Sequence, residues 1–193
     1  MKKVLFVVHG RLERNTQWLR IWKYIREQQE WKGAKVYTQR VGHAITLVVD
    51  GLKKERYDAV VACGGDGTLN ECVNGIVQSN SSVPLGMLSL GTGNDFVKSL
   101  GLSGCWEEVQ AALNNLSVVP CDVMRLETPT GLRFGINVSD IGIGGEVVQR
   151  ISQDNRWLGS FLTYQKNIVK SFLSFKSINV EVSIDHSPAI TKR

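Results

Sequence analysis

The sequence lacks any long apolar run, and this absence excludes a membrane-spanning helix from the expected structure. A span needs roughly 18 apolar residues, and no stretch of the 193-residue chain approaches that length. The run Val4–Val8 is also too short for a signal peptide, whose apolar core has about 7 to 15 residues. We therefore expect a cytoplasmic protein.

Cysteine and histidine are scarce, and their spacing excludes two common kinds of site. The four cysteines form no CxxC pair and have no histidine nearby, so a zinc site is not expected. The three histidines are scattered, and no serine or cysteine stands in a nucleophile-elbow context, so triad chemistry is not expected either. We expect all four cysteines to be buried as small apolar side chains: Cys63, Cys72, Cys105 and Cys121.

Acidic residues are few in the first third of the chain. Residues 1–60 hold thirteen Lys and Arg against six Asp and Glu, a local excess of +7 in a chain of net charge +5. A basic lobe suits an anionic partner such as nucleotide phosphates, an acidic membrane surface or nucleic acid, although on charge alone an ordinary solvated surface is favoured. No basic-aromatic motif or zinc finger accompanies it, so a nucleic-acid partner is not expected.

Apolar strands alternate with amphipathic helices over the first 125 residues. Alternation at this spacing predicts an α/β fold with a mostly parallel sheet and flanking helices. The aromatic stripe of Trp18, Leu19, Trp22 and Ile25 has helical spacing and indicates core packing. We expect strands at 4–8, 34–38, 58–63 and 84–90, and helices from 16 to Gly33 and at 42–55, 68–78 and 106–115.

The alternation stops after Pro120. Residues 118–126 and 132–138 are both strand-like, and the turn Thr128–Gly131 joins them without a helix. The tract Gly142–Gly145 predicts a turn into a helix, and a helix over 157–175 and a strand over 178–184 follow. We therefore predict an α/β nucleotide-binding domain over 1–123 and an incomplete β-rich second domain over 124–193.

The loop Gly64-Gly65-Asp66-Gly67-Thr68 stands between a predicted strand and a predicted helix. Its glycines let the backbone turn sharply and approach a ligand, and the helix N-terminus that follows favours an anion. Asp66 places a carboxylate beside this presumed phosphate site. A structural alternative is a capping box, in which Thr68 and Glu71 satisfy the first amides of the helix.

A second glycine loop, Leu90–Phe96, also follows an apolar strand and precedes a short helix. Thr92 or Asn94 can act as a helix N-cap there, and Asp95 can complement the helix dipole. Both loops should leave the sheet at the same edge, which favours phosphates and a divalent cation held by carboxylates through water. Neither loop matches the P-loop or the dinucleotide-binding pattern.

Together these two loops resemble the catalytic region of the diacylglycerol kinase family, which includes bacterial lipid kinases and is similar to sphingosine kinases. The resemblance extends to Thr38 before Gly42-His43-Ala44, to Lys98–Leu102, to Asp122 and to Gly135–Val138. It implies a fold of the NAD kinase and diacylglycerol kinase type.

The resemblance also implies an ATP- and Mg²⁺-dependent lipid kinase that phosphorylates a lipid hydroxyl, such as that of diacylglycerol, at a membrane surface. Asp66, Asp95 and Asp122 would organise Mg²⁺ through water, and Lys98 stands where the family often has arginine. The implied nucleotide contacts are Thr38, Gly64, Gly65, Asp66, Gly67, Thr68, Leu69, Asn70, Thr92, Asn94 and Lys98. The alternatives are a nucleotide-binding module without turnover and an NAD kinase-like enzyme.

Two departures from the family pattern bear on activity. The chain has His9-Gly10-Arg11 where the family usually has Asn-Pro, and Arg11 and Arg14 are candidates to replace the lost contact. The family's general base lies in a segment after residue 193, so no base is assigned, and we expect weak phosphoryl transfer and a tendency to form a homodimer. Asp140 and Glu146 are the first residues to test as a base within this chain.

Overall fold

The chain forms two compact units, residues 1–138 and 139–193, in a computed structural model. The structure describes residues 1–28, 30–115, 117–129, 131–139, 142–153, 160–175, 179–183, 185, 187–192. Within them, no helix combines the length and the apolarity that crossing a bilayer requires.

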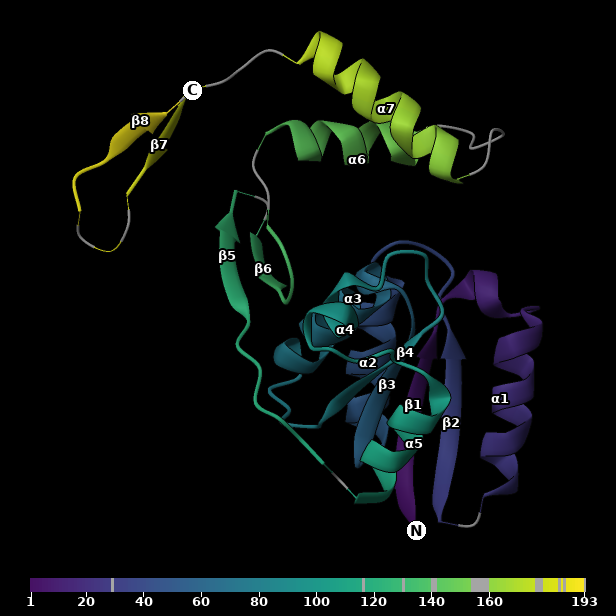
Figure 1. Ribbon diagram of the computed structural model, residues 1–193. Helices are drawn as coiled ribbons and strands as arrows, with labels where there is room; N and C mark the ends of the chain where they lie inside the picture. The colour runs from purple at the N-terminus through teal and green to yellow at the C-terminus, as the bar shows by residue number, and fades with distance from the viewer. Residues whose placement is uncertain are drawn as a thin grey trace. The chain divides into compact units, whose positions relative to one another are not determined.

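The first unit is built on four parallel strands: β1 (Lys2–Val8), β2 (Trp31–Tyr37), β3 (Ala59–Gly64) and β4 (Leu85–Ser89). They lie in the order β2-β1-β3-β4, and all three neighbouring pairs are parallel (Figure 1). Residues of β1 and β3 face two separate apolar clusters in alternation, because successive side chains of a strand point to opposite faces. The predicted α/β class with a mostly parallel sheet is confirmed.

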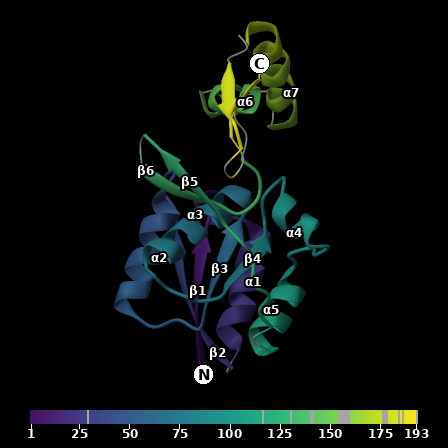
Figure 2. The ribbon, with the colours of Figure 1, turned by 90° about the vertical axis from the view of Figure 1, so that its left-hand side faces the viewer.

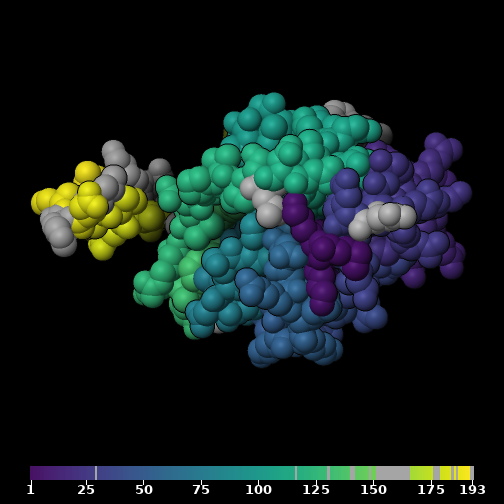
Figure 3. Space-filling view, turned by 90° about the horizontal axis from the view of Figure 1, so that it is seen from below, coloured from purple at the N-terminus to yellow at the C-terminus, as the bar shows by residue number. Residues whose placement is uncertain are grey.

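Helices cover both faces of this sheet. Helices α1 (Thr16–Glu27) and α5 (Trp106–Asn115) pack on one face, and α2 (His43–Lys54), α3 (Asp66–Gln78) and the short α4 (Asp95–Ser99) contribute to the other cluster. Figures 1 and 2 show α1 and α2 on opposite sides of the strands. A single 3₁₀ turn, η1 (Gly10–Leu12), follows β1. Figure 3 looks at the amino-terminal edge of the sheet, where the first residues lie at the surface.

Aromatic side chains fill the cluster between the sheet and helices α1 and α5. Phe6 of β1 lies 6.4 Å from Trp18 and 5.8 Å from Trp22 between ring centroids. Trp18 is fully buried and its Nε1 donates to the Tyr37 hydroxyl at 3.0 Å, so the indole loses no hydrogen bond. The core role predicted for the aromatic stripe is confirmed, except that Leu19 is largely exposed.

The first predicted helix is too long, because α1 ends at Glu27 and Gly33 lies inside β2. A β-carbon on Gly33 would lie 3.0 Å from Ile25 Cγ2 and 3.2 Å from Phe6 Cε2. Glycine therefore makes room there for side chains of α1 and β1, and it does not mark the end of a helix.

Strands β5 (Met124–Thr128) and β6 (Gly131–Gly135) form the antiparallel hairpin expected from the Thr128–Gly131 turn. Its strands are shorter than the predicted 118–126 and 132–138, because Met124 pairs with Gly135 and the preceding segment has no partner in this ladder. Asn74 of α3 holds β6: its Nδ2 donates to Phe134 O at 2.8 Å and its Oδ1 accepts from Phe134 N at 3.0 Å. The proposed domain boundary at 123/124 stays a prediction.

The second unit contains α6 (Ile143–Gln153), α7 (Ser160–Ser174) and the antiparallel pair β7 (Val180–Val182) and β8 (Ile190–Lys192). Helix α7 agrees with the helix predicted over 157–175, of which 157–159 lie outside the described residues. Strand β7 is shorter than the predicted 178–184, of which 178 and 184 lie outside the described residues, and sequence reasoning missed β8. The glycine tract 142–145 does lead into a helix, α6.

Only two of the four cysteines are buried as predicted. Burial raises the pKa of the Cys63 thiol well above its ordinary value and that of Cys72 to about 12, so both stay protonated. Cys105 is half-buried and Cys121 is exposed. Both lie in connecting segments outside strands and helices, where less apolar structure covers a side chain.

The contact between α2 and α3 generates a stability prediction. A β-carbon on Gly75 of α3 would lie 2.7 Å from Val48 Cβ and 2.9 Å from Ile45 O. Gly75→Ala should therefore lower the free energy of unfolding by roughly 1–3 kcal/mol, although alanine is the better helix former. Urea unfolding measures this loss. In the same helix, Gly67 has open space around its β-carbon position, so Gly67→Ala should cost nothing, and an equal loss in both variants would contradict the packing explanation.

Candidate functional site

The candidate site lies where β1, β3 and β4 end. Ligands of open parallel sheets bind at this carboxyl edge. Leu90 N donates to Gly64 O at 2.9 Å, and His9 N donates to Cys63 O at 2.9 Å. These bonds hold the segments after β4 and β1 against the end of β3.

The two glycine loops touch each other backbone to backbone. A β-carbon on Gly91 would lie 2.5 Å from Gly65 Cα and 2.9 Å from Gly65 N. No side chain can stand at position 91 without separating the loops, so glycine is required there by close approach. The predicted convergence of the loops at one edge is confirmed by this geometry.

Asp66 joins the first loop to the second. Its Oδ2 accepts from Asp95 N at 3.1 Å, and its Oδ1 accepts from Phe96 N at 3.0 Å. The carboxylate thus satisfies the first amides of α4, the task that an N-cap side chain usually performs. Each oxygen keeps a further lone pair for another partner.

Asn94 stands at the N-cap position of α4, as the structural alternative predicts, but its side chain makes no capping hydrogen bond. Asn94 has left-handed backbone (φ 57°), and its Nδ2 donates back to Gly91 O at 3.0 Å. Its Oδ1 is buried without a hydrogen-bond partner among the described atoms. The cap comes from Asp66 because the loops are in contact, and Thr92 is exposed.

A second carboxylate lies beside Asp66. A β-carbon on Gly93 would lie 3.3 Å from Asp66 Oδ2 and 3.4 Å from Asp95 Oδ2, so both carboxylates flank this glycine. Lys98 Nζ lies 3.8 Å from Asp95 Oδ1, and both side chains are exposed. The structure therefore brings together Asp66, Asp95 and Lys98 of the predicted set.

Asp122 is not part of a compact carboxylate cluster. It is exposed in the segment before β5. Over the described part of the chain, no group of three His, Cys, Asp or Glu side chains is arranged to hold a metal. Participation of Asp122 in a site bridged by water stays a prediction.

Thr38 fixes the loop after β1. Its Oγ1 accepts from Gly10 N at 3.0 Å, and its own amide donates to Val8 O at 2.9 Å. A β-carbon on Gly10 would overlap the Thr38 carbonyl oxygen. At His9-Gly10-Arg11 the chain departs from the family pattern. The contact of Gly10 with the end of β2 explains why glycine stands there.

The capping-box alternative for Thr68 and Glu71 is wrong. Helix α3 begins at Asp66, before Thr68, and its N-cap Gly65 makes no side-chain bond. Glu71 instead accepts from Gly42 N at 2.8 Å and Ala44 N at 3.0 Å, so its carboxylate caps α2. Sequence reasoning missed this because the two residues belong to different helices.

Four predicted contacts from α3 differ in what they present to a ligand. Thr68 and Leu69 are buried, and Leu69 belongs to the apolar cluster beneath α3. Asn70 is half-buried, and its carbonyl accepts from Asn74 Nδ2 at 2.8 Å. Gly67 is exposed with open space around it.

His9 lies beside the first loop, because a β-carbon on Gly64 would lie 3.2 Å from His9 Cβ. Its Nδ1 accepts from Arg11 N at 3.2 Å. Burial, and after it the charge of Arg11, lower the pKa of His9, while Glu71 opposes the shift. The neutral imidazole is therefore favoured in the folded chain.

A separate hollow of about 340 Å³ opens between α1, the end of β4 and the start of α5. Arg20, Ser89, Trp106 and Glu107 are among its lining residues. It includes none of the predicted nucleotide contacts.

Comparison of the sequence with models of known protein families gives a match that includes both glycine loops. Residues 3–126 match the model of the diacylglycerol kinase catalytic domain. The chain belongs to the diacylglycerol kinase catalytic domain family. Both glycine loops fall within the matched residues, so the resemblance based on them is confirmed.

Proteins and solved structures that resemble this chain are named as lipid or diacylglycerol kinases. Proteins named "putative lipid kinase" from Staphylococcus aureus strains bovine RF122 / ET3-1 and JH9 are each 27% identical over 128 residues. Two solved structures of a "putative diacylglycerol kinase" from Bacillus anthracis str. Sterne are 27% and 28% identical, with TM-scores of 0.53 and 0.51. They support the fold of the first unit.

These matches cover part of each protein. The aligned region is 66% of this chain and 41% of the Staphylococcus aureus relatives. The structural matches cover 63% of this chain and 44% and 40% of the Bacillus anthracis chains. The chain therefore spans well under two thirds of the proteins that it resembles.

The capping role of Asp66 leads to a prediction that separates it from Asp95. Asp66→Ala removes the acceptor of two α4 amides and should lower the free energy of unfolding by about 1 kcal/mol. Asp95→Ala removes an exposed carboxylate and should change it by less than about 0.5 kcal/mol. Urea unfolding of both variants, without nucleotide, tests this difference, and equal losses would argue against the cap.

His9 gives the first unit a pH dependence. Its pKa is lower in the folded chain than the ordinary value of 6.5, so the unfolded chain binds more protons below that pH. Stability should therefore fall as pH drops from about 6.5 through the folded pKa. Urea midpoints at about pH 7.5 and about pH 5.5 measure this loss. His9→Gln, whose side chain cannot titrate, should lose less stability than the parent between these two pH values. An equal loss in both proteins would mean that other groups cause the pH dependence.

Proposed function

We propose that the chain is the nucleotide-binding part of an ATP- and Mg²⁺-dependent lipid kinase that phosphorylates a lipid hydroxyl, such as that of diacylglycerol. The observation that carries the proposal is the contact between the two glycine loops at the N-terminus of α3. Membership of a kinase family supports the use of ATP.

The phosphates would lie at the first turn of α3. The first amides of a helix have no partner within it, and the helix dipole favours negative charge there. Gly67 has no neighbouring atom within 4 Å of its β-carbon position, which leaves room for a ligand to approach the backbone. Thr92 is exposed on the facing loop and can donate to a phosphate oxygen.

The cation would be held by Asp66 and Asp95. Carboxylate oxygens are the ligands that Mg²⁺ prefers, usually with several waters retained. The two carboxylates that flank Gly93 fit this chemistry, and Asp122 would contribute through water. A bound Mg²⁺ would neutralise charge that develops on the phosphates. Lys98 adds a positive point charge beside them.

The lipid hydroxyl needs a group that accepts its proton, and no residue of this chain is assigned to that task. Glu146 Oε1 already accepts from Arg150 Nε and Nη2 at 2.9 and 2.6 Å, which favours a structural role. Asp140 lies outside the described residues.

Two other functions use the same loops. A nucleotide-binding module without turnover would bind ATP and transfer no phosphate. An NAD kinase-like enzyme would bind NAD as well. The family match over both loops favours the lipid kinase.

Nucleotide binding is tested by a matched pair of substitutions at Gly65. A β-carbon at Gly65 has only an ordinary contact, 3.5 Å to Gly91 Cα, so Gly65→Ala should fold and bind. Gly65→Asp adds a negative charge at the phosphates and should weaken ATP binding at least about tenfold. Calorimetry with ATP, and thermal shifts with ATP, NAD and glycerol phosphate, distinguish the candidates. Equal ATP affinity of both variants would reject the site.

Metal dependence and transfer complete the test. ATP should bind more tightly with Mg²⁺, and Asp95→Asn should reduce that gain more than it reduces binding of free ATP. Transfer of the γ-phosphate to diacylglycerol in mixed micelles, abolished by Gly65→Asp, would support the kinase. Binding without any transfer would favour the module without turnover.

A further inference from the structure

The hollow between α1, the end of β4 and the start of α5 is a second concave site of the first unit. Its volume of about 340 Å³ falls within the range of about 300–1,000 Å³ that small-molecule pockets occupy. A single water accounts for only about 30 Å³. None of the predicted nucleotide contacts lines this hollow, so a molecule bound there would be distinct from the nucleotide.

Helices α1 and α5 touch each other beside the hollow. Tyr24 of α1 packs against Trp106 with ring centroids 6.3 Å apart, and its hydroxyl accepts from Gln110 Nε2 at 3.2 Å. Arg20 lies one helical turn before Tyr24, and Glu107 directly follows Trp106. Both charged residues line the hollow. The hollow therefore has a positive side chain on its α1 wall and a negative one on its α5 wall.

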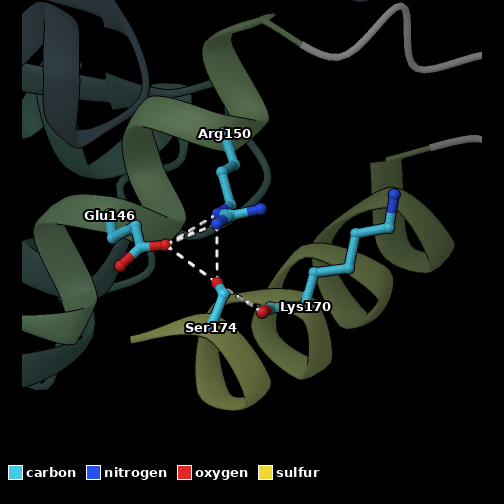
Figure 4. A network of polar contacts seen from close by, with 4 residues as sticks. All are labelled: Glu146, Arg150, Lys170 and Ser174. Atoms are coloured by element: carbon cyan, nitrogen blue, oxygen red, sulfur yellow. Dashed lines mark hydrogen bonds and ion pairs between the residues drawn. The ribbon is translucent and has the colours of Figure 1, made fainter. Parts of the chain in front are cut away.

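These two charges do not neutralise each other. Elsewhere in the chain neighbouring opposite charges do pair, as Figure 4 shows for Arg150, whose Nη2 lies 2.6 Å from Glu146 Oε1. Arg20, by contrast, forms no ion pair with any residue that the structure describes, including Glu107. Hydrogen bonds from its own amide and from the Cys105 thiol lower the pKa of Glu107, so its carboxylate is charged at neutral pH.

The backbone of α1 adds to the positive wall. Thr16 and Gln17, the first two residues of α1, also line the hollow. The N-cap Asn15 accepts from Trp18 N at 2.9 Å, whereas the amides of Thr16 and Gln17 have no partner among the described residues. Unpaired first amides and the helix dipole favour an anion. A carboxylate suits this wall, because the Arg20 guanidinium can donate two parallel hydrogen bonds to it.

The hollow also has apolar surface and two polar atoms without partners. Ile21, Leu88 and Trp106 supply the apolar surface. Ser89 Oγ and Trp106 Nε1 are buried, and neither has a hydrogen-bond partner in the part of the chain that the structure describes. Unpaired polar atoms of this kind cost free energy. After a small side-chain rotation, a polar molecule in the hollow would supply the missing partners.

We propose that this hollow binds a free amino acid with an apolar side chain. The carboxylate would face Arg20 and the first amides of α1, and the ammonium group would face Glu107. The side chain would lie against the apolar surface at Leu88 and Trp106. A simple anion would be repelled by Glu107 and a simple cation by Arg20, whereas an amino acid carries both charges on one carbon. The inference is independent of the proposed kinase activity.

Calorimetry on the whole chain tests the inference with leucine and two analogues that each lack one charge. Leucinamide lacks the carboxylate and N-acetylleucine lacks the ammonium group, so each should bind the parent at least about tenfold more weakly than leucine. Arg20→Gln should bind leucine and leucinamide equally, and Glu107→Gln should bind leucine and N-acetylleucine equally. Arg26→Gln, an exposed position of α1 outside the hollow, should bind all three ligands like the parent.

The outcomes separate this inference from the proposed function. A parent that does not bind leucine at about 10 mM, or that binds leucine and both analogues equally, would overturn the proposal and leave the hollow to water. Unchanged leucine affinity in Arg20→Gln or Glu107→Gln would also overturn it. Both residues are exposed and neither is a predicted nucleotide contact, so ATP affinity should be the same in all four proteins. A failure of ATP binding would leave the leucine result standing.

Discussion

The bonds from the Asp66 carboxylate to the first two amides of α4 hold the candidate site together. They fix the second glycine loop on the first, and the close approach of Gly91 to Gly65 is possible only because Gly91 has no side chain. Asp66 is therefore both a structural cap and a candidate ligand for a cation. A bound cation would share these oxygens with the backbone of α4, which couples the position of that helix to the occupancy of the site.

The sheet could be predicted because its strands are continuous apolar runs buried on both faces, a pattern that few other structures produce. Val4–Val8 and Ala59–Cys63 are of this kind, and both form central strands. The end of α1 could not be predicted from local signals. Gly33 leaves space for Ile25 of α1 and Phe6 of the neighbouring strand β1, and only the tertiary structure brings these side chains to it. Strand β8, with three residues, offers too short a pattern to recognise.

The candidate site was predictable as two loops and less so as a set of side-chain roles. Glycine patterns indicate where a backbone approaches a ligand, and the family match supports that interpretation. The roles of Glu71, Asp66 and Asn74 depend on tertiary contacts, because each side chain bonds to the backbone of a segment remote in sequence. The local sequence pattern predicts that Glu71 caps its own helix in a capping box. In the structure its carboxylate instead accepts hydrogen bonds from the first amides of α2.

Through these three residues, α3 holds three neighbouring segments of the first unit. Asp66, Glu71 and Asn74 hold amides and carbonyls, and every amino acid except proline offers those groups alike. The bonds to α2, α4 and β6 therefore do not depend on which side chains stand at the bonded positions, whereas a change at any of the three α3 positions removes the bonds that it makes. A substitution at Phe134 therefore leaves both bonds between Asn74 and β6 available, whereas loss of the Asn74 amide group removes both.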